Sequence, residues 1–352
     1  MKVKGKHYRT VWMQDKTVYL IDQSLLPFKF NIIETSDYRK LCEVIKNMNT
    51  RGAGAIGATA GFAMALAIDK FNNNENLHKS ILKAKKEIEA TRPTARNLFY
   101  ATNRVYRTAQ NHDFDGQTAI NEARKISEED IADCKKIGEY GNELIKDGFN
   151  IETHCNAGWL GFSDVGSALA PIYIANQHHK KIHVFVDETR PRNQGSRLTA
   201  WELTNENIPY TIIPDNTGAF LMQQGKIDMM IVGADRIAAN GDVANKIGTL
   251  EKAIAAAEYN VPFYVAAPFS TIDFSCPSGK NIDIEARDKK EILTVFGNAD
   301  SKIGRFHVTN KSYNALNIAF DVTPAKFITG IITEKGIFKP DDLKNQFKFK
   351  KE

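Results

Sequence analysis

The sequence predicts an α/β protein, with a parallel sheet in its C-terminal half and a small antiparallel sheet plus helices in its N-terminal half. Short β-branched runs and helical patterns alternate regularly after residue 149, as in a Rossmann-like domain. Before it, apolar and polar residues alternate over residues 8–33, and helical periodicity follows over residues 36–147. The chain has 352 residues, which exceeds one usual core. We therefore expect two domains, residues 1–148 and 149–352.

The N-terminal half is predicted to begin with three short antiparallel strands and to continue as helices. Ser36 is a good helix cap, and apolar residues follow it at helical spacing. Gly57 and Gly61 share one face of a small-residue helix, which indicates close packing against a neighbour. The predicted helices cover residues 36–45, 53–71, 75–90, 95–110 and 115–146.

The C-terminal half is predicted to consist of repeated βα units. The predicted strands are residues 150–154, 181–187, 210–213, 229–233, 263–266 and 327–332. The predicted helices are residues 164–177, 195–205, 245–259 and 314–320. Such alternation places the strands side by side and in parallel, with helices covering both faces.

Composition narrows the class of protein. Apolar residues make up 42% and charged residues 25%, as in ordinary soluble proteins, and no apolar run has the ~20 residues of a membrane span. The first residues are basic without an apolar segment behind them, so we expect a cytoplasmic protein. The four cysteines have no metal-binding or disulfide spacing and are expected to be free thiols. A net charge of +5, with its lysines spread out apart from residues 348–351, gives no reason to expect nucleic-acid or membrane partners.

Chemically active residues follow the predicted strands. Cys155, residues 188–191 (ETRP), Asp235 and residues 268–271 (PFST) each come after a different strand. The carboxyl ends of parallel strands meet at one edge of a sheet, where open α/β proteins bind ligands. Lys246 is predicted to lie at a helix start, a position suited to anions. We therefore expect a site for an anionic small molecule, with no metal and no other cofactor.

Three other features have simpler interpretations. His154 adjoins Cys155, but neighbouring strand residues face opposite sides, so we interpret His154 as structural. Residues 51–57 (RGAGAIG) do not follow a strand, which argues against a dinucleotide loop. Asn240-Gly241 predicts a tight turn.

Several segments resemble the S-methyl-5-thioribose-1-phosphate isomerases of methionine salvage. The matching segments are RGAGAIG at residues 51–57, TRPTARNLFYA at 91–101, HCNAG at 154–158, DETRPRNQGSRLTAWEL at 187–203, VGADRIAANGDVANKIGT at 232–249 and VAAPFSTID at 265–273. The same superfamily contains ribose-1,5-bisphosphate isomerases and non-catalytic regulatory subunits of a translation initiation exchange factor. Cys155 and Asp235, which the regulatory subunits as a rule lack, favour an enzyme.

The resemblance implies a set of roles. Cys155 and Asp235 would be the catalytic pair, and the enzyme would be a Rossmann-like homodimer whose partner is a small sugar phosphate. The residues expected to hold the substrate are Arg51, Gly52, Ala53, Arg92, Gln194, Asn245 and Lys246.

Three positions depart from the family pattern. Gly54 replaces the usual proline, Trp159 replaces a small residue, and Asn193 replaces the commoner leucine. A bulky Trp159 close to Cys155 in the sequence is expected to reshape the pocket for the sugar's 5-substituent. Ribose 1,5-bisphosphate, 5-deoxyribose 1-phosphate and a non-enzymatic regulatory role therefore stay open beside 5-methylthioribose 1-phosphate.

The reaction can also be argued from chemistry. The phosphate on C1 of an aldose 1-phosphate prevents spontaneous ring opening, so an acid must protonate the ring oxygen. A carboxyl buried at a strand end stays protonated more easily, which suits Asp235. Hydrogen then moves from C2 to C1, by a base through an enediolate or by a direct hydride shift. Cys155 fits the first route as a thiolate base and the second as a polarizable stabiliser of the transition state.

Overall fold

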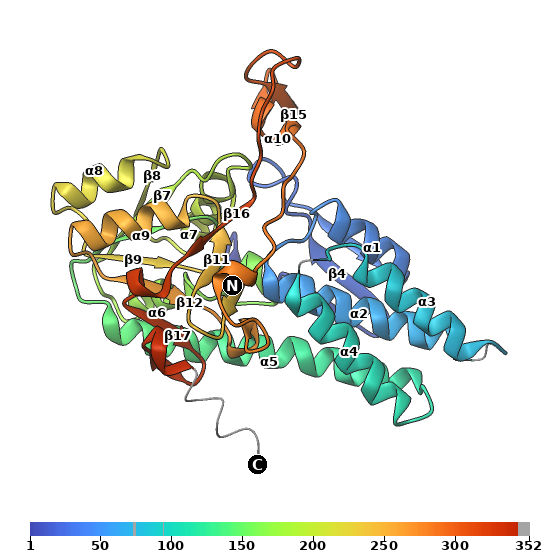
Figure 1. Cartoon of the computed structure of the whole chain (residues 1–352). Helices are drawn as coiled ribbons and strands as arrows, with labels where there is room; N and C mark the ends of the chain where they lie inside the picture. Colours follow the sequence, from blue (N-terminus) through green and yellow to red (C-terminus); the bar gives the residue numbers. More distant parts are fainter. Residues whose placement is uncertain (73–74, 94, 344–352) are drawn as a thin grey trace. The chain divides into compact units, whose positions relative to one another are not determined.

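The computed structural model describes residues 1–72, 75–93 and 95–343 (Figure 1). Unit 1 comprises Met1–Leu25, Phe30–Cys134 and Trp159–Gly166, and unit 2 comprises Leu26–Lys29, Lys135–Gly158 and Ser167–Glu352. The division falls within one long helix, and the sequence-based boundary between residues 148 and 149 stays a prediction. Thr94 of the TRPTARNLFYA segment and the lysines of residues 348–351 lie outside the described residues.

Unit 1 contains the small antiparallel sheet and the helices that the sequence predicts. Its strands are β1 (Lys2–Val3), β2 (Lys6–His7), β3 (Val11–Gln14), β4 (Thr17–Ile21) and β5 (Ile32–Thr35), of which the last three form one sheet. Its helices are α1 (Tyr38–Lys46), α2 (Ala53–Phe71), α3 (Leu77–Glu89), α4 (Arg96–Gln110) and the start of α5 (Gly116–Leu144).

Helix α2 forms the centre of the unit 1 core. An ideal Cβ on Gly57 would lie 3.1 Å from Asn97 Cβ, and one on Gly61 would lie 3.6 Å from Ala101 Cβ. The glycines therefore let α4 approach closely, as predicted. By length and composition α2 is apolar enough to span a membrane, but 83% of that window is buried inside the protein, as in a core helix.

Unit 2 is built on a seven-stranded sheet in the order β18-β17-β12-β9-β6-β7-β8. All its pairings are parallel except that of β17 with the edge strand β18, so the predicted parallel sheet is confirmed. The strands are β6 (Asn150–Thr153), β7 (His183–Asp187), β8 (Tyr210–Ile213), β9 (Met229–Val232), β12 (Phe263–Ala266), β17 (Gly330–Thr333) and β18 (Gly336–Phe338). Its helices are α6 (Ala170–Gln177), α7 (Ala200–Asn205), α8 (Thr217–Gln223), α9 (Thr249–Glu258) and α10 (Lys290–Leu293).

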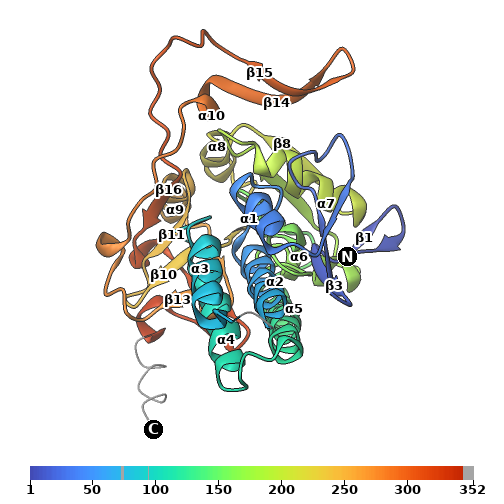
Figure 2. The same cartoon turned by 90° about the vertical axis from the view of Figure 1, so that its right-hand side faces the viewer.

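Two further β elements of unit 2 were not predicted (Figure 2). A four-stranded sheet has the order β13-β10-β11-β16, and a separate hairpin pairs β14 with β15. The strands are β10 (Arg236–Ala238), β11 (Val243–Lys246), β13 (Ile272–Asp273), β14 (Thr294–Ala299), β15 (Lys302–His307) and β16 (Phe320–Thr323). Asn240-Gly241 makes the tight β10–β11 turn, as predicted, and Gly241 has φ +85°.

Three predicted helices differ from the structure. Residues 314–320 are not helical, because the chain runs extended into β16, which pairs with β11. The helix predicted from residue 164 begins only at Ala170, since Val165 and Gly166 have φ of +66° and +87°. The helix predicted from residue 245 begins at Thr249, after Gly248 with φ +102°. Each difference arises where a left-handed residue or a distant strand prevents the helix.

Candidate active site

Cys155 follows β6 at the carboxyl end of the parallel sheet, as predicted. Its backbone has φ +67°, which a non-glycine residue rarely adopts. Two threonines hold that backbone: Thr189 Oγ1 accepts the Cys155 N–H at 2.9 Å, and Thr199 Oγ1 donates to the Cys155 carbonyl at 2.7 Å. The thiol is partly exposed and free. The segment therefore presents a thiol with a rigidly held backbone.

Asp235 lies in the loop that follows β9. An ideal Cβ on Gly233, two residues earlier, would lie 2.5 Å from Ala157 Cβ, so this loop packs against the segment after Cys155. The Asp235 N–H donates to Ala244 O at 3.0 Å. The residue is exposed, so the expectation of a buried carboxyl is wrong. The reason is that Asp235 lies in the short loop between β9 and β10, which leaves it at the surface.

Gln194 follows β7 and lies directly before the helical turn Gly195–Thr199. It is 5% exposed, and its Oε1 has no hydrogen-bond partner in the described part of the chain. A buried amide oxygen without a donor is unusual, and a bound hydroxyl would supply one. This observation fits the predicted contact with substrate.

Asn245 and Lys246 lie on β11 rather than at a helix start. The prediction for Lys246 is therefore wrong in its local structure, because β11 pairs with β16 through residue 246, which lies opposite Phe320. Asn245 Nδ2 donates to Thr249 Oγ1 at 3.1 Å. Lys246 is 5% exposed, its Nζ donates to Ala319 O at 3.0 Å, and it lies 4.4 Å from the Phe320 ring centroid. Lys246 thus supplies a fixed, largely desolvated positive charge.

The other predicted substrate residues belong to unit 1. Arg51, Gly52 and Ala53 lie at the start of α2, with Gly52 as the N-cap at φ +89°. An ideal Cβ on Gly52 would lie 2.3 Å from Gly161 Cα, so only glycine fits there. Arg92 lies between α3 and α4, and its carbonyl accepts the Ala95 N–H at 3.1 Å. The first N–H groups of α2 have no intrahelical acceptor and are suited to an anion.

The departures from the family pattern have local structural reasons. A Cβ on Gly54 would lie 2.4 Å from Asp130 Oδ1 and 2.5 Å from Phe162 Cδ1, so a larger residue there requires these two side chains to move. Asn193 has φ +57°, a conformation that asparagine adopts far more readily than leucine. Trp159 lies in unit 1, is fully buried, and its carbonyl accepts the Thr10 Oγ1 hydrogen bond at 2.6 Å. The backbone conformation of Asn193 thus accounts for one of these changes, whereas the Trp159 hydrogen bond uses a backbone carbonyl and does not explain the tryptophan.

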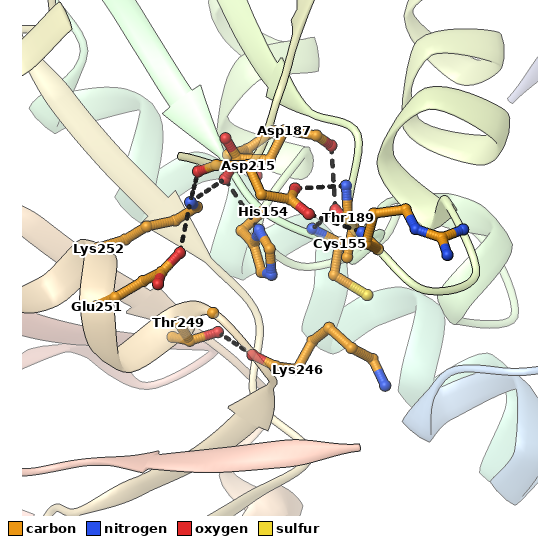
Figure 3. Close-up of polar contacts among 12 residues, drawn as sticks. His154, Cys155, Asp187, Thr189, Asp215, Lys246, Thr249, Glu251 and Lys252 are labelled. Carbon is orange, nitrogen blue, oxygen red and sulfur yellow. Dashed lines mark hydrogen bonds and ion pairs between the residues drawn. The ribbon is translucent and has the colours of Figure 1, made fainter. Parts of the chain in front are cut away.

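A buried polar network lies beside Cys155 and was not predicted (Figure 3). His154 Nδ1 lies 2.9 Å from Asp187 Oδ2, and its Nε2 lies 2.8 Å from Ile247 O. Lys252 Nζ lies 3.3 Å from Asp187 Oδ2 and also donates to Asp215 O. His154, Asp187 and Lys252 are 1%, 0% and 3% exposed. The network therefore joins the ends of β6, β7 and β8 to helix α9.

Burial shifts the pKa values of the ionisable side chains in and beside this network. Burial raises the pKa of Glu152 to about 8, and the neighbouring Asp187 adds to the effect. Burial likewise raises the pKa of Asp187 to about 8, against the opposing charge of Lys252. Burial, followed by the charge of Lys252, lowers the pKa of His154 to about 4. These shifts favour protons on the carboxyls and a neutral imidazole near pH 7.

Ligand atoms of His154, Asp187 and Asp215 lie within 4.8 Å of one another, close enough to suggest a metal. However, the Lys252 ammonium contacts Asp187 and the Asp215 carbonyl, so a fixed cation already supplies positive charge there. The Asp215 carboxylate accepts the N–H groups of Thr189 and Arg190 at 2.6 and 2.7 Å. The donor set is thus occupied by the protein's own groups.

Comparisons with known proteins give a consistent result. A family model described as the initiation factor 2 subunit family matches residues 49–340. The methylthioribose-1-phosphate isomerase of Methylocella silvestris is 46% identical, with 96% of each chain covered. The enzyme of the same name from Acetivibrio thermocellus is 47% identical over 94% of this chain and 96% of its own.

Solved structures of the same fold are also similar. The 5-methylthioribose 1-phosphate isomerase of Pyrococcus horikoshii has a TM-score of 0.87 and 41% identity, covering 98% of this chain and 96% of its own. A protein described as translation initiation factor eIF-2B, subunit delta, from A. fulgidus has a TM-score of 0.81 and 38% identity, covering 96% and 97%. The likeness therefore extends over both units.

Proposed function

Since this chain belongs to the methylthioribose-1-phosphate isomerases, within the initiation factor 2 subunit family, we propose that Cys155 and Asp235 carry out its aldose–ketose isomerisation. The substrate is 5-methylthioribose 1-phosphate and the product is 5-methylthioribulose 1-phosphate, a step of methionine salvage. The observation that supports the role of Cys155 best is that its side chain and that of Lys246, both in unit 2, extend toward the same side of the close-up (Figure 3).

Ring opening requires a proton on the ring oxygen as its bond to C1 breaks. Asp235 is proposed to donate this proton and afterwards to take the proton of the O2 hydroxyl, which leaves the carboxyl in its starting state. Asp235 is exposed, so a substrate can reach its carboxyl from solvent.

Hydrogen transfer from C2 to C1 has two balanced routes. In the first, the Cys155 thiolate removes the C2 proton and returns it to C1 of the phosphorylated enediol. In the second, a hydride moves from C2 to the cationic C1, and Cys155 stabilises that cation as a polarizable neighbour. Both routes end with a carbonyl at C2 and a CH₂ group at C1 bearing the phosphate.

Substrate binding is proposed for the same residues that the sequence suggests, in each unit. In unit 1 these are Arg51, Gly52 and Ala53 at the α2 start, together with Arg92. Guanidinium groups and free helix N–H groups are suited to phosphate. In unit 2 they are Gln194, Asn245 and Lys246, of which Gln194 offers an unpartnered buried acceptor and Lys246 a positive charge.

Turnover of synthetic 5-methylthioribose 1-phosphate tests the assignment. Asp235→Asn is expected to abolish turnover while calorimetric binding of substrate persists, because the amide keeps the shape and loses the acid. Cys155→Ser is expected to lower kcat by ~10²–10⁴-fold. Ribose 1,5-bisphosphate and 5-deoxyribose 1-phosphate serve as comparison substrates, and a more than ~tenfold preference for the bisphosphate, about 1.4 kcal/mol, would contradict the substrate assignment. If the wild type converts none of the three, a non-enzymatic regulatory role replaces the catalytic one.

The isomerisation in D₂O separates the two hydrogen-transfer routes. Deuterium at C1 of the ketose supports the base route, and its absence supports the hydride shift or a base shielded from solvent. Both routes move only protons or hydride within the substrate, so turnover is expected without added metal or nicotinamide.

A cytoplasmic homodimer that binds neither nucleic acid nor membrane is proposed for the assembled protein. Sedimentation equilibrium of the purified protein tests the oligomeric state. A monomer at micromolar concentration would contradict the dimer.

A further inference from the structure

His154 makes two hydrogen bonds that fix both nitrogens of its ring. Its Nε2 lies 2.8 Å from the backbone carbonyl of Ile247, and its Nδ1 lies 2.9 Å from Asp187 Oδ2. A carbonyl oxygen only accepts, so Nε2 must carry hydrogen and donate. One further proton lies between Nδ1 and Asp187. The ring has therefore one orientation and a defined donor.

The bond to Ile247 joins two segments that carry the proposed chemistry. His154 immediately precedes Cys155, and Ile247 immediately follows Lys246. The imidazole is located between the β6 end and the chain that leaves β11, while the Cys155 and Lys246 side chains extend past it toward one side (Figure 3). An ideal Cβ on Gly248 would lie 3.1 Å from the ring, so the next residue also packs on the imidazole. The separation of Cys155 from Lys246 thus depends on this ring.

The ring in turn is held by a buried polar network. Asp187, at the end of β7, contacts Lys252 of α9 at 3.3 Å, and Lys252 donates to Asp215 O. The Asp215 carboxylate accepts the Thr189 N–H, and Thr189 Oγ1 accepts the Cys155 N–H. This closed circuit of hydrogen bonds begins and ends at consecutive residues of one segment. A displaced imidazole would therefore displace the Cys155 backbone as well.

A second set of bonds fixes the other side of the contact. The Asp321 carboxylate of β16 accepts the N–H groups of Gly248 and Leu250 at 2.7 and 3.2 Å. Thr249 Oγ1 donates to the Lys246 carbonyl at 2.6 Å. The turn after Lys246 is consequently rigid, and His154 is the side chain through which the Cys155 segment contacts it.

We propose, on the basis of the roles proposed above for Cys155 and Lys246, that His154 is a positioning residue whose imidazole sets the distance between the thiol and the ammonium by donating to Ile247 O. It does not contact the reacting atoms. Its contribution is to fix the position of the Lys246 ammonium relative to the Cys155 thiol before substrate binds.

Two amide variants separate the two ring nitrogens. In His154→Gln the amide nitrogen overlays Nε2 and can still donate to Ile247 O, whereas in His154→Asn it overlays Nδ1 and cannot reach that carbonyl. We expect His154→Gln to keep kcat/KM within ~tenfold of wild type. His154→Asn is expected to lose ~10²-fold, because a displacement near 1 Å has an effect of that size, and at least ~tenfold of the loss should appear as a higher KM. His154→Leu, which fills the volume without a donor, should behave as His154→Asn does.

KM is the informative quantity, because a purely structural histidine would change the amount of folded enzyme and leave the KM of the folded remainder unchanged. Thermal melts followed by circular dichroism measure that folded fraction. The proposal is overturned if His154→Asn has the wild-type KM, if both amide variants lose activity equally while folded, or if neither His154→Asn nor His154→Leu folds. Wild-type turnover, and its loss in Cys155→Ser, report on the proposed function separately and do not depend on these variants.

Discussion

Glu152 provides a quantitative test of the buried carboxyl cluster. It is fully buried on β6, and both its oxygens lack a hydrogen-bond donor among the residues that the structure describes. Burial first, and then the neighbouring Asp187, raise its pKa from the ordinary 4.5 to about 8. We infer that Glu152 is protonated near pH 7. The substitution Glu152→Gln keeps a donor of similar shape and removes the ionisation.

The expected effect follows from the linkage between proton binding and folding. Below pH 4.5 the carboxyl is protonated in both the folded and unfolded chains, and its stabilising contribution is complete. As the pH rises toward 8, the unfolded chain releases the proton and the folded chain retains it, so the free energy of unfolding falls. A tenfold change in proton affinity corresponds to about 1.4 kcal/mol. Moving the pKa from 4.5 to about 8 therefore gives a loss of up to about 5 kcal/mol, an upper limit because Asp187 titrates together with it.

Urea unfolding followed by circular dichroism at pH 4.5, 6.5 and 8.5 measures this loss. We expect Glu152→Gln to be within about 1 kcal/mol of wild type at pH 4.5. At pH 8.5 it should be the more stable protein by about 2 kcal/mol or more, because it has no ionisation to oppose. Glu251→Gln is the matched control, since Glu251 lies near the same Lys252 but is 63% exposed. Parallel curves for wild type and Glu152→Gln across this range would refute the reasoning.

The remaining predictions concern the same neighbourhood. Lys252→Met is expected to lower the free energy of unfolding by about 1–3 kcal/mol, because it leaves the buried Asp187 side chain and the Asp215 carbonyl without the Lys252 donor. Glu251→Gln should cost less than about 1 kcal/mol, since Glu251 is 63% exposed. Equal losses in urea unfolding would argue against the buried contacts of Lys252. Gly195→Ala places a Cβ 1.7 Å from the Asp187 carbonyl oxygen, a backbone atom, so we expect the free energy of unfolding to fall by at least about 3 kcal/mol and turnover to be lost. Gly304→Ala is the control, because its Cβ points into open space, and its free energy of unfolding should stay within about 0.5 kcal/mol of wild type. A Gly195→Ala protein with the wild-type melting temperature would contradict the close packing after β7.

The fold was predictable where its signals are local. The strand from Phe263 to Ala266 was predicted at its observed bounds, and the helix from Ala53 to Phe71 likewise, because each is a continuous apolar segment with clear ends. The sheet of β10, β11, β13 and β16 was not predicted. Its strands have two to four residues and pair across as many as 80 positions, so no short-range periodicity reveals them. The same pairing turned the predicted helix start at Lys246 into a strand.

The site was predictable to the extent that its residues end strands. Cys155 and Asp187 both follow this rule, and Asp187 opens the DETRP segment. Lys252 gives no such signal, since a lysine in a helix of mixed polarity reads as a surface residue, and only the packing of α9 against the sheet buries it. His154 was interpreted as structural, which agrees with its burial and its two hydrogen bonds. The alternation of residues on β6 places Glu152 on the same face, and this was the available clue to the cluster.

The distribution of backbone strain argues that the loops around Cys155 are shaped for function rather than for stability. Cys155 and Thr189 have φ of +67° and +64°, and the second is β-branched, which makes it a rare conformation. Such residues cost on the order of 1–3 kcal/mol each and persist only where surrounding bonds over-determine them. Here Asp215 holds the Thr189 N–H and Thr189 holds the Cys155 N–H, so each strained residue is fixed by the next. The buried network of Asp187, Asp215 and Lys252 thus both stabilises the fold and positions the Cys155 backbone. Lys252→Met should therefore impair turnover at temperatures where the chain is still folded.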